Sequence, residues 1–452
     1  MIVAAPALLL GAAAGLAFAI RKRLPYVSGL TLGAIAIAIA LVATHSDDAT
    51  GELLGVSLRL SPLARLATVT LLATLGLLTI DVAIAQPAYN FFPTALAIGA
   101  VAAGVLVLTT PLLIFSLLLV GLLIPVGSFT FQIDRNRSVE AAIRHYSFVV
   151  LGGCLGLGAL ALATALPKDQ PAQTVVLLVV LIFIAFALML AAIPFHTHAA
   201  LLAAEAPVAA LGLYFGVLVP LTFIAFAQIL ATSGLLPAII QLSRVQDLLL
   251  GIGLVSAVGG ALLACGAQDL RRLVVYAVIS NLGAALAGIA TLSGPGIIGG
   301  IAIALVTGVA ATQQLLAAGA LERHAGADRP NVGHAPLAAA TFIAGGVAMI
   351  GAPPLVSFPG HFFVELIAYA VSPVAGTALF GATLLLVIAQ LRAGVALFRG
   401  SPDAWRIEAR PTAGVIGIVI FLGLFAGGIV PDSFLRPIAA FATEFLKALR
   451  PL

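Results

Sequence analysis

Long apolar stretches separated by short polar loops dominate the chain. A helix that crosses a membrane needs roughly 20 apolar residues, and about fourteen stretches reach that length. They cover residues 2–20, 26–44, 63–84, 91–109, 111–129, 139–166, 173–195, 206–231, 248–267, 271–292, 296–321, 335–372, 374–399 and 412–430. The last segment, 433–450, is amphipathic, which is typical of a helix at the membrane surface. The pattern predicts an all-α integral membrane protein.

Two of the predicted spans contain a break. The stretch 335–372 is too long for one straight crossing and holds Pro353 and Pro354 in its middle. Adjacent prolines remove backbone donors and interrupt a helix. The stretch 173–195 ends at Pro194. Interrupted helices at matching places in two halves of a membrane protein point to an ion or substrate path.

The breaks suggest how the single membrane domain, 1–452, is organised. Each break falls in the fourth span of a five-helix block, and these blocks cover 91–231 and 248–399. We therefore predict a first and a second repeat. They follow three N-terminal helices in 1–84 and precede a C-terminal helix with an amphipathic tail in 412–452.

Composition supports the membrane assignment and narrows the chemistry. Of 452 residues, 62% are hydrophobic and 8% are charged, whereas soluble domains carry roughly 25% charged residues. The net charge of +4 is spread along the chain, so no nucleic-acid partner is expected.

Cys154 and Cys265 lie in apolar segments and are interpreted as small hydrophobic residues. The three lysines, Lys22, Lys168 and Lys447, lie at segment ends or in loops. We expect no cofactor and no catalytic residue.

The distribution of Lys and Arg predicts the orientation. Loops after odd-numbered spans hold twelve basic residues and the opposite loops hold seven. Basic residues favour the cytoplasmic side, so both termini are predicted outside a bacterial or archaeal inner membrane. The first span carries its charges, Arg21, Lys22 and Arg23, after the apolar run. We interpret it as a retained helix and not as a signal peptide.

Ionisable groups inside a bilayer are costly and usually functional. Glu140 and Arg144 are four residues apart and can pair along one helix face, either as an interfacial anchor or as part of a path. His361 and Glu365 are also four apart, in the second half of the broken span 335–372. A proton-binding pair and a structural pair are equally compatible with that spacing. Arg392, in the middle of its span, requires an internal acceptor or a wet cavity.

Two further clusters lie in links between spans. His196, His198 and Glu205 could supply zinc ligands, but no third strong ligand is evident. We favour a histidine that caps the interrupted helix or relays protons, and we predict no metal. Asp269, Arg271 and Arg272 occupy a short turn, where ion pairing and lipid headgroups account for their charges.

Four stretches of the sequence resemble motifs of one family. They are 138–144, 194–197 with 204–208, 268–276 with Ser280, and 351–354 with Phe358 and Phe362. In this order they are similar to a Glu-Ala-Ala-x-Lys segment, a Pro-Phe-His-x-Trp link into Ala-Glu-Ala-Pro, an Asp-x-Lys-Arg-x-x-Ala-Tyr-Ser segment and a broken twelfth helix. The family is the antiporter-like, proton-translocating membrane subunits of respiratory complex I, group 4 membrane-bound hydrogenases and multisubunit Na⁺/H⁺ antiporters. Hydrogenase-associated members look most similar.

The resemblance implies fourteen helices in two inverted five-helix repeats, with helices seven and twelve broken. It also implies a subunit of an oxidoreductase or translocase complex, with other membrane subunits and lipids as partners. Such a subunit is not an enzyme by itself. Family members move protons along a chain of intramembrane acids and lysines.

This chain departs from the family at those carriers. The positions of the family's carriers correspond here to Leu119 or Val120, to Met189, to a residue between Val217 and Pro220, and to a residue near Ala311, beside Gln313 and Gln314. His198 stands where the family's Pro-Phe-His-x-Trp link has its tryptophan. Of the carrier positions, only the one in the broken twelfth helix keeps a titratable group, His361. Apolar side chains cannot bind or release protons. We therefore predict a mainly structural subunit with a degenerate channel. The alternative is active H⁺ or Na⁺ translocation along a rerouted path through Glu140, His196, Glu205, His361 and Glu365. A standalone transporter of a small solute fits worst, because no polar substrate cluster is evident.

Overall fold

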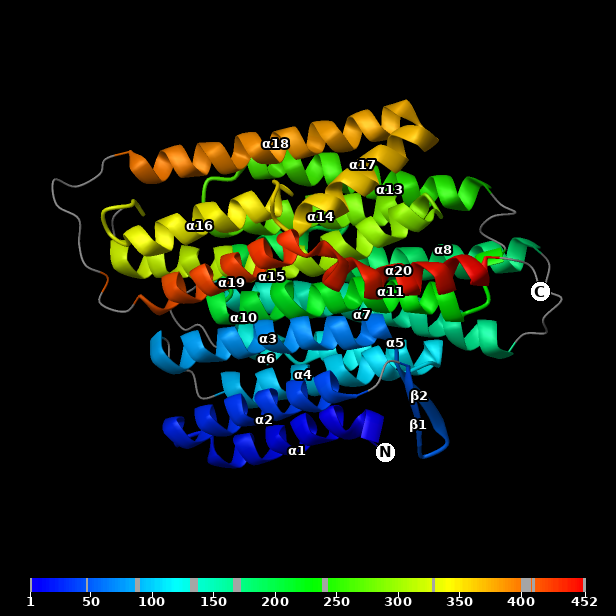
Figure 1. The fold of residues 1–452 in the computed structure, drawn as a ribbon, viewed down its shortest axis with the longest axis horizontal. Helices are drawn as coiled ribbons and strands as arrows, with labels where there is room; N and C mark the ends of the chain where they lie inside the picture. Colours follow the sequence, from blue (N-terminus) through cyan, green and yellow to red (C-terminus); the bar gives the residue numbers. More distant parts are fainter. Residues whose placement is uncertain are drawn as a thin grey trace.

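The structure is a computed structural model that describes residues 2–45, 48–85, 90–130, 137–165, 172–237, 243–326, 330–399, 408 and 411–449. Its helices lie side by side and run roughly parallel or antiparallel to one another (Figure 1). In the described residues, eleven helices are long and apolar enough to cross a membrane. Three shorter apolar helices, Phe91–Val107, Gln173–Met189 and Pro336–Met349, accompany them. The prediction of a helical, multi-pass membrane protein is confirmed.

The first half of the chain begins with a short 3₁₀ turn and contains a hairpin after its second long helix. Its elements are η1 (Ile2–Ala4), α1 (Ala5–Ile20), α2 (Leu24–Thr44), β1 (Ala49–Leu53), β2 (Val56–Leu60), α3 (Pro62–Ala85), α4 (Phe91–Val107), α5 (Pro111–Leu123), α6 (Val126–Thr130), α7 (Ser138–Ala165), α8 (Ala172–Met189), α9 (Thr197–Glu205), α10 (Val208–Leu213), the π-helix η2 (Tyr214–Leu218) and α11 (Val219–Thr232).

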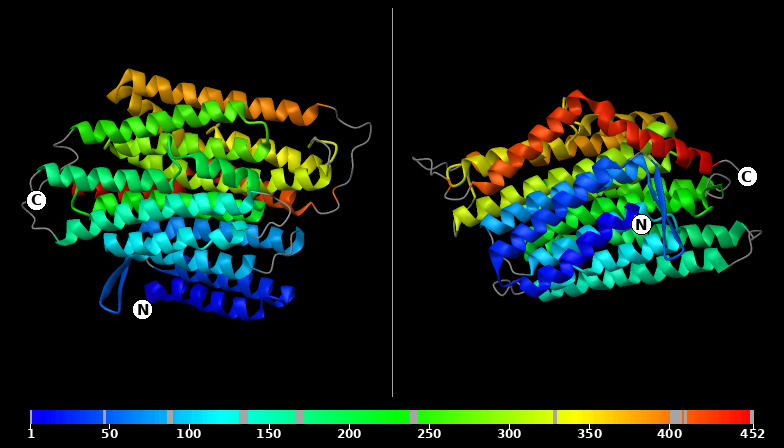
Figure 2. Two further views of the ribbon diagram at one scale, coloured as in Figure 1. Left: turned by 180° about the vertical axis from the view of Figure 1, so that it is seen from behind. Right: turned by 60° about the horizontal axis from the view of Figure 1, so that its bottom comes forward.

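The second half is helical throughout its described elements. These are α13 (Ser243–Gly266), α14 (Leu270–Ala290), α15 (Gly294–Ala325), α16 (Pro336–Met349), α17 (Ser357–Val371), α18 (Pro373–Phe398), α19 (Thr412–Ile429) and α20 (Pro431–Ala448). The view from behind shows the same layered bundle, with α1 and α18 at opposite edges (Figure 2, left). The N-terminal end of α1 and the C-terminal end of α20 lie toward the end of the bundle that carries the hairpin (Figure 1).

Both predicted helix breaks are present. The predicted span 173–195 ends as a helix at Met189, and α9 begins at Thr197. The predicted span 335–372 is divided into α16 and α17, with residues 350–356 between them. Gly351 in this gap has φ +69°, a conformation that glycine adopts without steric cost. The gap therefore depends on this glycine as well as on the prolines.

Small residues allow the central helices to touch through their backbones. A Cβ atom on Gly283 of α14 would lie 2.3 Å from the backbone nitrogen of Ala257 in α13. A Cβ on Gly216 of η2 would lie 2.0 Å from Oγ1 of Thr312 in α15. Close approach at small residues is a common way for membrane helices to associate. These contacts join α13 to α14 and the first half of the chain to the second.

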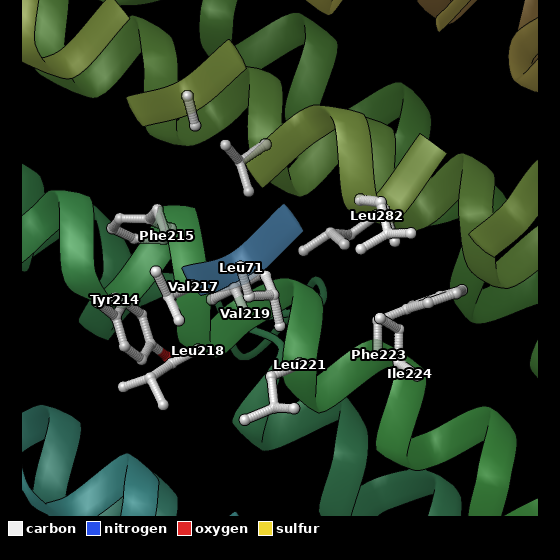
Figure 3. Packing of buried hydrophobic residues seen from close by; sticks show 14 of the residues in the cluster. Leu71, Tyr214, Phe215, Val217, Leu218, Val219, Leu221, Phe223, Ile224 and Leu282 are labelled. Carbon is white, nitrogen blue, oxygen red and sulfur yellow. The ribbon is translucent and has the colours of Figure 1, made fainter. Parts of the chain in front are cut away.

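The centre of the molecule is formed by α10, η2 and α11. Side chains from Tyr214 to Ile224 pack with Leu71 of α3 and Leu282 of α14 (Figure 3). A continuous 18-residue stretch of Val208–Thr232 is buried. This span therefore contacts protein on all sides and presents no face to lipid.

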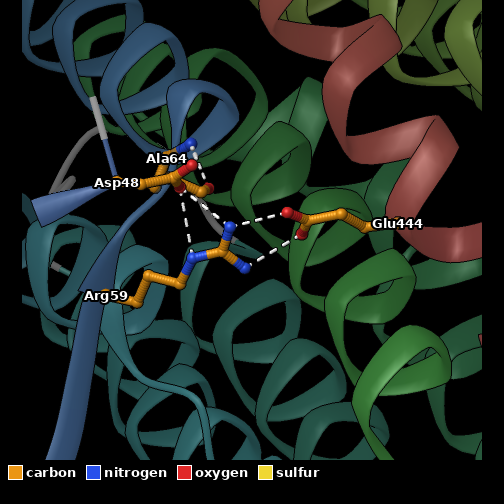
Figure 4. A network of polar contacts seen from close by, with 5 residues as sticks. Asp48, Arg59, Ala64 and Glu444 are labelled. Carbon is orange, nitrogen blue, oxygen red and sulfur yellow. Dashed lines mark hydrogen bonds and ion pairs between the residues drawn. The ribbon is translucent and has the colours of Figure 1, made fainter. Parts of the chain in front are cut away.

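Sequence analysis did not predict the β-hairpin. β1 and β2 pair antiparallel through a two-residue turn, Leu54–Gly55, whose φ angles of +52° and +79° are typical of a type I′ turn. Arg59 of β2 contacts Asp48 at 2.8 Å and Glu444 of α20 at 2.6 Å (Figure 4). These two carboxylates raise the pKa of Arg59, Glu444 having the larger effect. The hairpin is thereby connected to α20.

The amphipathic segment predicted at the C-terminal end is α20. Its apolar residues Ile438, Phe441 and Phe445 are buried, and the helix contacts α3 and α15. The apolar face therefore packs against the bundle.

Candidate functional site

His361 and Glu365 line one pocket in the second half of the molecule. The pocket lies between α14, α15, α17 and α18, and it is also lined by Ser280, Asn281 and Thr383. The space for the centre of a water molecule is about 10 Å³, close to the roughly 10–15 Å³ that one water requires. The predicted face shared by His361 and Glu365 therefore exists and has room for about one water.

The two titratable groups of the pocket differ in their surroundings. The His361 side chain is buried, and no hydrogen bond joins it to the other described residues. Glu365 is half-buried, and its Oε1 accepts a hydrogen bond of 2.7 Å from Thr383 Oγ1 of α18. Such a pair, with one water, can bind and release a proton in a partly buried site.

Asn281 of α14 connects this pocket to the break between α16 and α17. Its Nδ2 donates to Thr307 Oγ1 at 3.1 Å and to the carbonyl of Met349 at 2.8 Å. Met349 is the last residue of α16, whose terminal carbonyls lack helical partners. Sequence analysis did not single out Asn281, because a lone amide in an apolar span has no characteristic spacing.

A network of three glutamines lies next to the same break. Gln314 Nε2 donates to Gln390 Oε1 at 3.0 Å and to the carbonyl of Phe342 at 3.1 Å. Gln390 Nε2 donates back to Gln314 Oε1 at 3.4 Å. Gln313 Nε2 donates to the carbonyl of Thr341 at 3.0 Å. Amides satisfy buried carbonyls but do not titrate, so this network holds helices together without carrying protons.

Apolar side chains occupy the positions where the resemblance places carriers, in the first half and, at Ala311 of α15, in the second half. Met189, Val217 and Ala311 are buried at 0–1% exposure. Leu119 is half-buried and fills the space beside Gly153. The structure therefore places hydrocarbon at the positions where sequence analysis predicted the loss of ionisable groups.

His196, His198 and Glu205, in the link between two predicted spans, differ in how deeply their side chains are buried. His198 is completely buried, whereas His196 and Glu205 are partly exposed. Among the described residues, no group of three histidine, cysteine or acidic side chains could hold a metal ion. His198 instead lies 5.6 Å, between ring centroids, from His145 of α7, a residue that sequence analysis did not connect with it.

Glu140 and Arg144 form the predicted ion pair at 2.8 Å, and Glu140 also pairs with Arg137 at 2.7 Å. Their side chains are 38–56% exposed. Solvent-accessible pairs of this kind contribute little to stability. The arrangement fits the interfacial anchor better than a buried path.

The ion pairing expected for Arg271 is present, but its partner lies outside the turn. Its side chain is 9% exposed and forms an ion pair with Glu322 of α15, and its Nη1 donates to the carbonyl of Ala206 at 3.1 Å. Sequence analysis missed Glu322, which is 51 residues away. Asp269 does lie at the turn, where it caps α14 by accepting from the backbone nitrogen of Arg272 at 2.8 Å.

Two other charged groups have contacts that the sequence did not reveal. Arg392 of α18 donates to the carbonyl of Ala267, which follows α13, so its predicted internal acceptor is a backbone group. Asp81 of α3 is completely buried, and its Oδ1 accepts from Thr412 Oγ1 at 3.1 Å. Asp81 was overlooked because it lies near the end of its helix.

Comparisons with known proteins agree with these motifs. The profile of the family described as NADH:quinone oxidoreductase/Mrp antiporter, transmembrane, matches residues 145–389, more than half of the chain. The chain belongs to this family. The match includes the His361 pocket, Gln313 and Gln314, and the His145–His198 contact.

Individual relatives within the family are similar over different lengths. NADH-quinone oxidoreductase subunit 13 of Thermus thermophilus is 31% identical over 242 residues, which are 50% of this chain and 48% of that protein. The chain thus matches about half the length of this relative. NADH-quinone oxidoreductase subunit M of Rickettsia typhi is 25% identical over 71% of this chain and 69% of that protein.

The fold of this family member is also found in a solved structure. A chain of respiratory complex I from Thermus thermophilus, determined with bound NADH, superposes with a TM-score of 0.85 at 21% identity and covers 100% of both chains. At this identity the match establishes the fold alone. The antiporter-like fold therefore extends over the complete chain, beyond the part that the family profile matches.

Proposed function

We propose that this chain is an antiporter-like membrane subunit of a complex I-related, redox-driven ion-pumping complex. We further propose that its own proton channel is degenerate and that its role is mainly structural. Other membrane subunits and lipids are its partners in this proposal. The closer affinity to hydrogenase-associated members remains a prediction from the motifs.

One observation carries the structural role. An 18-residue stretch of the central span Val208–Thr232 is buried among protein side chains, and in this span the residues from Val217 to Pro220 are apolar and buried. A proton path needs groups that bind and release protons, with water or polar groups between them. Hydrocarbon at the centre of the first half interrupts such a path.

The His361 pocket favours the alternative, active translocation of H⁺ or Na⁺. His361 and Glu365 share space for a water, and Asn281 adds a polar wall. The rerouted path would also require Glu140, His196 and Glu205, which lie on α7, beside α9 and at the end of α9. The pocket is on the other half of the molecule, so this path must cross the apolar centre.

The finer architecture belongs to the same proposal. Eleven long apolar helices and three shorter ones are compatible with fourteen crossings in two inverted repeats, with breaks before α9 and before α17. The hairpin end of the bundle, where α1 begins and α20 ends, would face outward from a bacterial or archaeal inner membrane. Labelling of single cysteines at residues 54 and 272 from each side of sealed vesicles tests this orientation.

The function is tested by His361→Ala and Glu365→Gln in the assembled complex. Redox-linked proton uptake into proteoliposomes is measured at equal turnover, with Thr383→Val as the control that removes a hydrogen bond but no titratable group. We expect intact assembly and unchanged pumping in all three variants. A decrease equal to one channel's share, confined to the His361 and Glu365 variants, would overturn the structural role.

A further inference from the structure

His145 and His198 are neighbouring residues inside the first half of the chain, and among the described residues each has one unpaired nitrogen. His145 lies on α7 and His198 on α9, both at 0% exposure. Among the described residues, His145 Nδ1 and His198 Nε2 have no hydrogen-bond partner. A buried polar atom that remains unsatisfied destabilises the folded state.

The other nitrogen of each ring determines the proton positions. His145 Nε2 lies 3.1 Å from the carbonyl of Leu122, and His198 Nδ1 lies 3.0 Å from the carbonyl of Phe195. A carbonyl oxygen only accepts hydrogen bonds, so both of these nitrogens must carry the proton. In the neutral rings, the two unpaired nitrogens are therefore both acceptors, and they cannot bond to each other.

Among the described residues, no neighbouring side chain donates a hydrogen bond to either unpaired nitrogen. Phe129 lies edge-on to His145 at 5.3 Å between ring centroids, and Phe148 stacks on His198 at 4.8 Å. Tyr214 lies edge-on to His145 at 4.8 Å, but its hydroxyl donates to the carbonyl of Met189 at 3.2 Å. The site thus requires a donor from outside the chain that can serve two acceptors.

We propose that a buried water molecule occupies this site and donates one hydrogen bond to His145 Nδ1 and one to His198 Nε2. Water is neutral, so the site avoids the cost of burying a charge. Buried waters in proteins typically serve polar atoms that would otherwise be unsatisfied. The ring centroids lie 5.6 Å apart, so the two rings are direct neighbours.

This water gives the site a role in positioning the helix break. His198 is the second residue of α9, the helix that resumes after the gap at residues 190–196, and His145 belongs to the long helix α7. The water bridge therefore fixes the start of α9 against α7. The inference goes beyond the proposed function, because it holds whether or not the subunit translocates ions.

A double-mutant cycle in the purified complex tests the bridge. His145→Phe and His198→Phe each remove one acceptor and leave the water and the other ring poorly paired, so each lowers the Tm. In the double variant the site is apolar and the water leaves, and we expect a loss of Tm clearly smaller than the sum of the single losses. His145→Phe combined with His324→Phe, a histidine elsewhere on α15, is the control and should give additive losses.

Direct observation completes the test and remains informative if a variant fails to assemble. We expect a cryo-EM map of the complex at water-resolving resolution to show density within hydrogen-bond distance of both nitrogens. Additive losses in the cycle without such density would overturn the proposal. One transition-metal ion per chain in elemental analysis would contradict the proposal, because a metal would then occupy the site in place of water. A non-additivity of the Tm losses that disappears as the pH rises would mean that the two rings share a proton and not a water. The neighbouring titratable groups in such a pH series are His196 and Tyr214.

Discussion

The two halves of the molecule bury different kinds of side chain between their packed helices, mainly apolar ones in the first half and more amides in the second. In the first half, Val208–Thr232 is buried by apolar side chains, and its amide Gln228 makes one hydrogen bond, of 3.3 Å, to the Leu106 carbonyl. In the second half, buried amides and the His361 pocket connect α14, α15, α16 and α18. Polar groups in a membrane protein are retained where they have partners. The comparison indicates that hydrogen bonds between buried amides and neighbouring helices are concentrated in the second half.

The largest expected effect comes from a charge placed in each half. Leu218→Lys puts an ammonium group among fully buried apolar side chains, and burying an unpaired charge is prohibitively costly. We expect loss of folded, monodisperse protein by size-exclusion chromatography. Gln314→Lys is expected to fold, because the carbonyl of Phe342 and Gln390 Oε1 can accept from the new group. The control is Leu218→Met, which conserves volume.

Equal tolerance of lysine at both positions would show that water reaches the first half, and the contrast between the halves would then be wrong. A folded Leu218→Lys variant would further favour the rerouted path over the structural role.

The next effect concerns Arg271, which contacts both halves of the chain. Arg271→Ala removes a buried partner of Glu322 and the donor to the Ala206 carbonyl, and breaking a buried ion pair typically costs about 3–5 kcal/mol. We expect a large decrease in the Tm of the purified complex. Arg144→Ala, in an exposed pair, is the control and should leave the Tm unchanged. Similar Tm values for the two variants would mean that Arg271 does not join the halves.

The smallest effect compares one amide from each half. Gln390→Leu leaves Gln314 Oε1 without its reciprocal donor, at a cost of about 1–3 kcal/mol. Gln228→Leu removes one bond of 3.3 Å to the Leu106 carbonyl and also an oxygen that is already unpaired. We therefore expect the Tm to decrease more for Gln390→Leu. The opposite order would contradict the view that the second half depends more on its amides.

Sequence analysis succeeded where chemistry is local along the chain. Spans follow from apolar runs, and the breaks follow from prolines 194, 353 and 354, because proline interrupts a helix whatever its surroundings. The i, i+4 pairs Glu140–Arg144 and His361–Glu365 follow from helical periodicity. It failed for contacts between distant segments, including Arg271 with Glu322 and His145 with His198.

The hairpin was missed for a different reason. β1 and β2 have five residues each and connect through Leu54 and Gly55, whereas the strongest sequence signal for such a turn is Asn-Gly or Asp-Gly. The Leu54-Gly55 pair is only a weak sequence signal for a two-residue hairpin turn. Glu444, the partner that connects the hairpin to α20, lies 385 positions from Arg59 along the chain.

The sequence by itself determined that the chain crosses a membrane many times, where two helices break, and to which family it belongs, because these properties depend on composition and short-range spacing. Tertiary structure alone decided which polar groups share a pocket, which glutamines pair, and which two histidines meet. Those contacts depend on how helices pack across the bundle, and helix packing brings together residues that no local pattern connects.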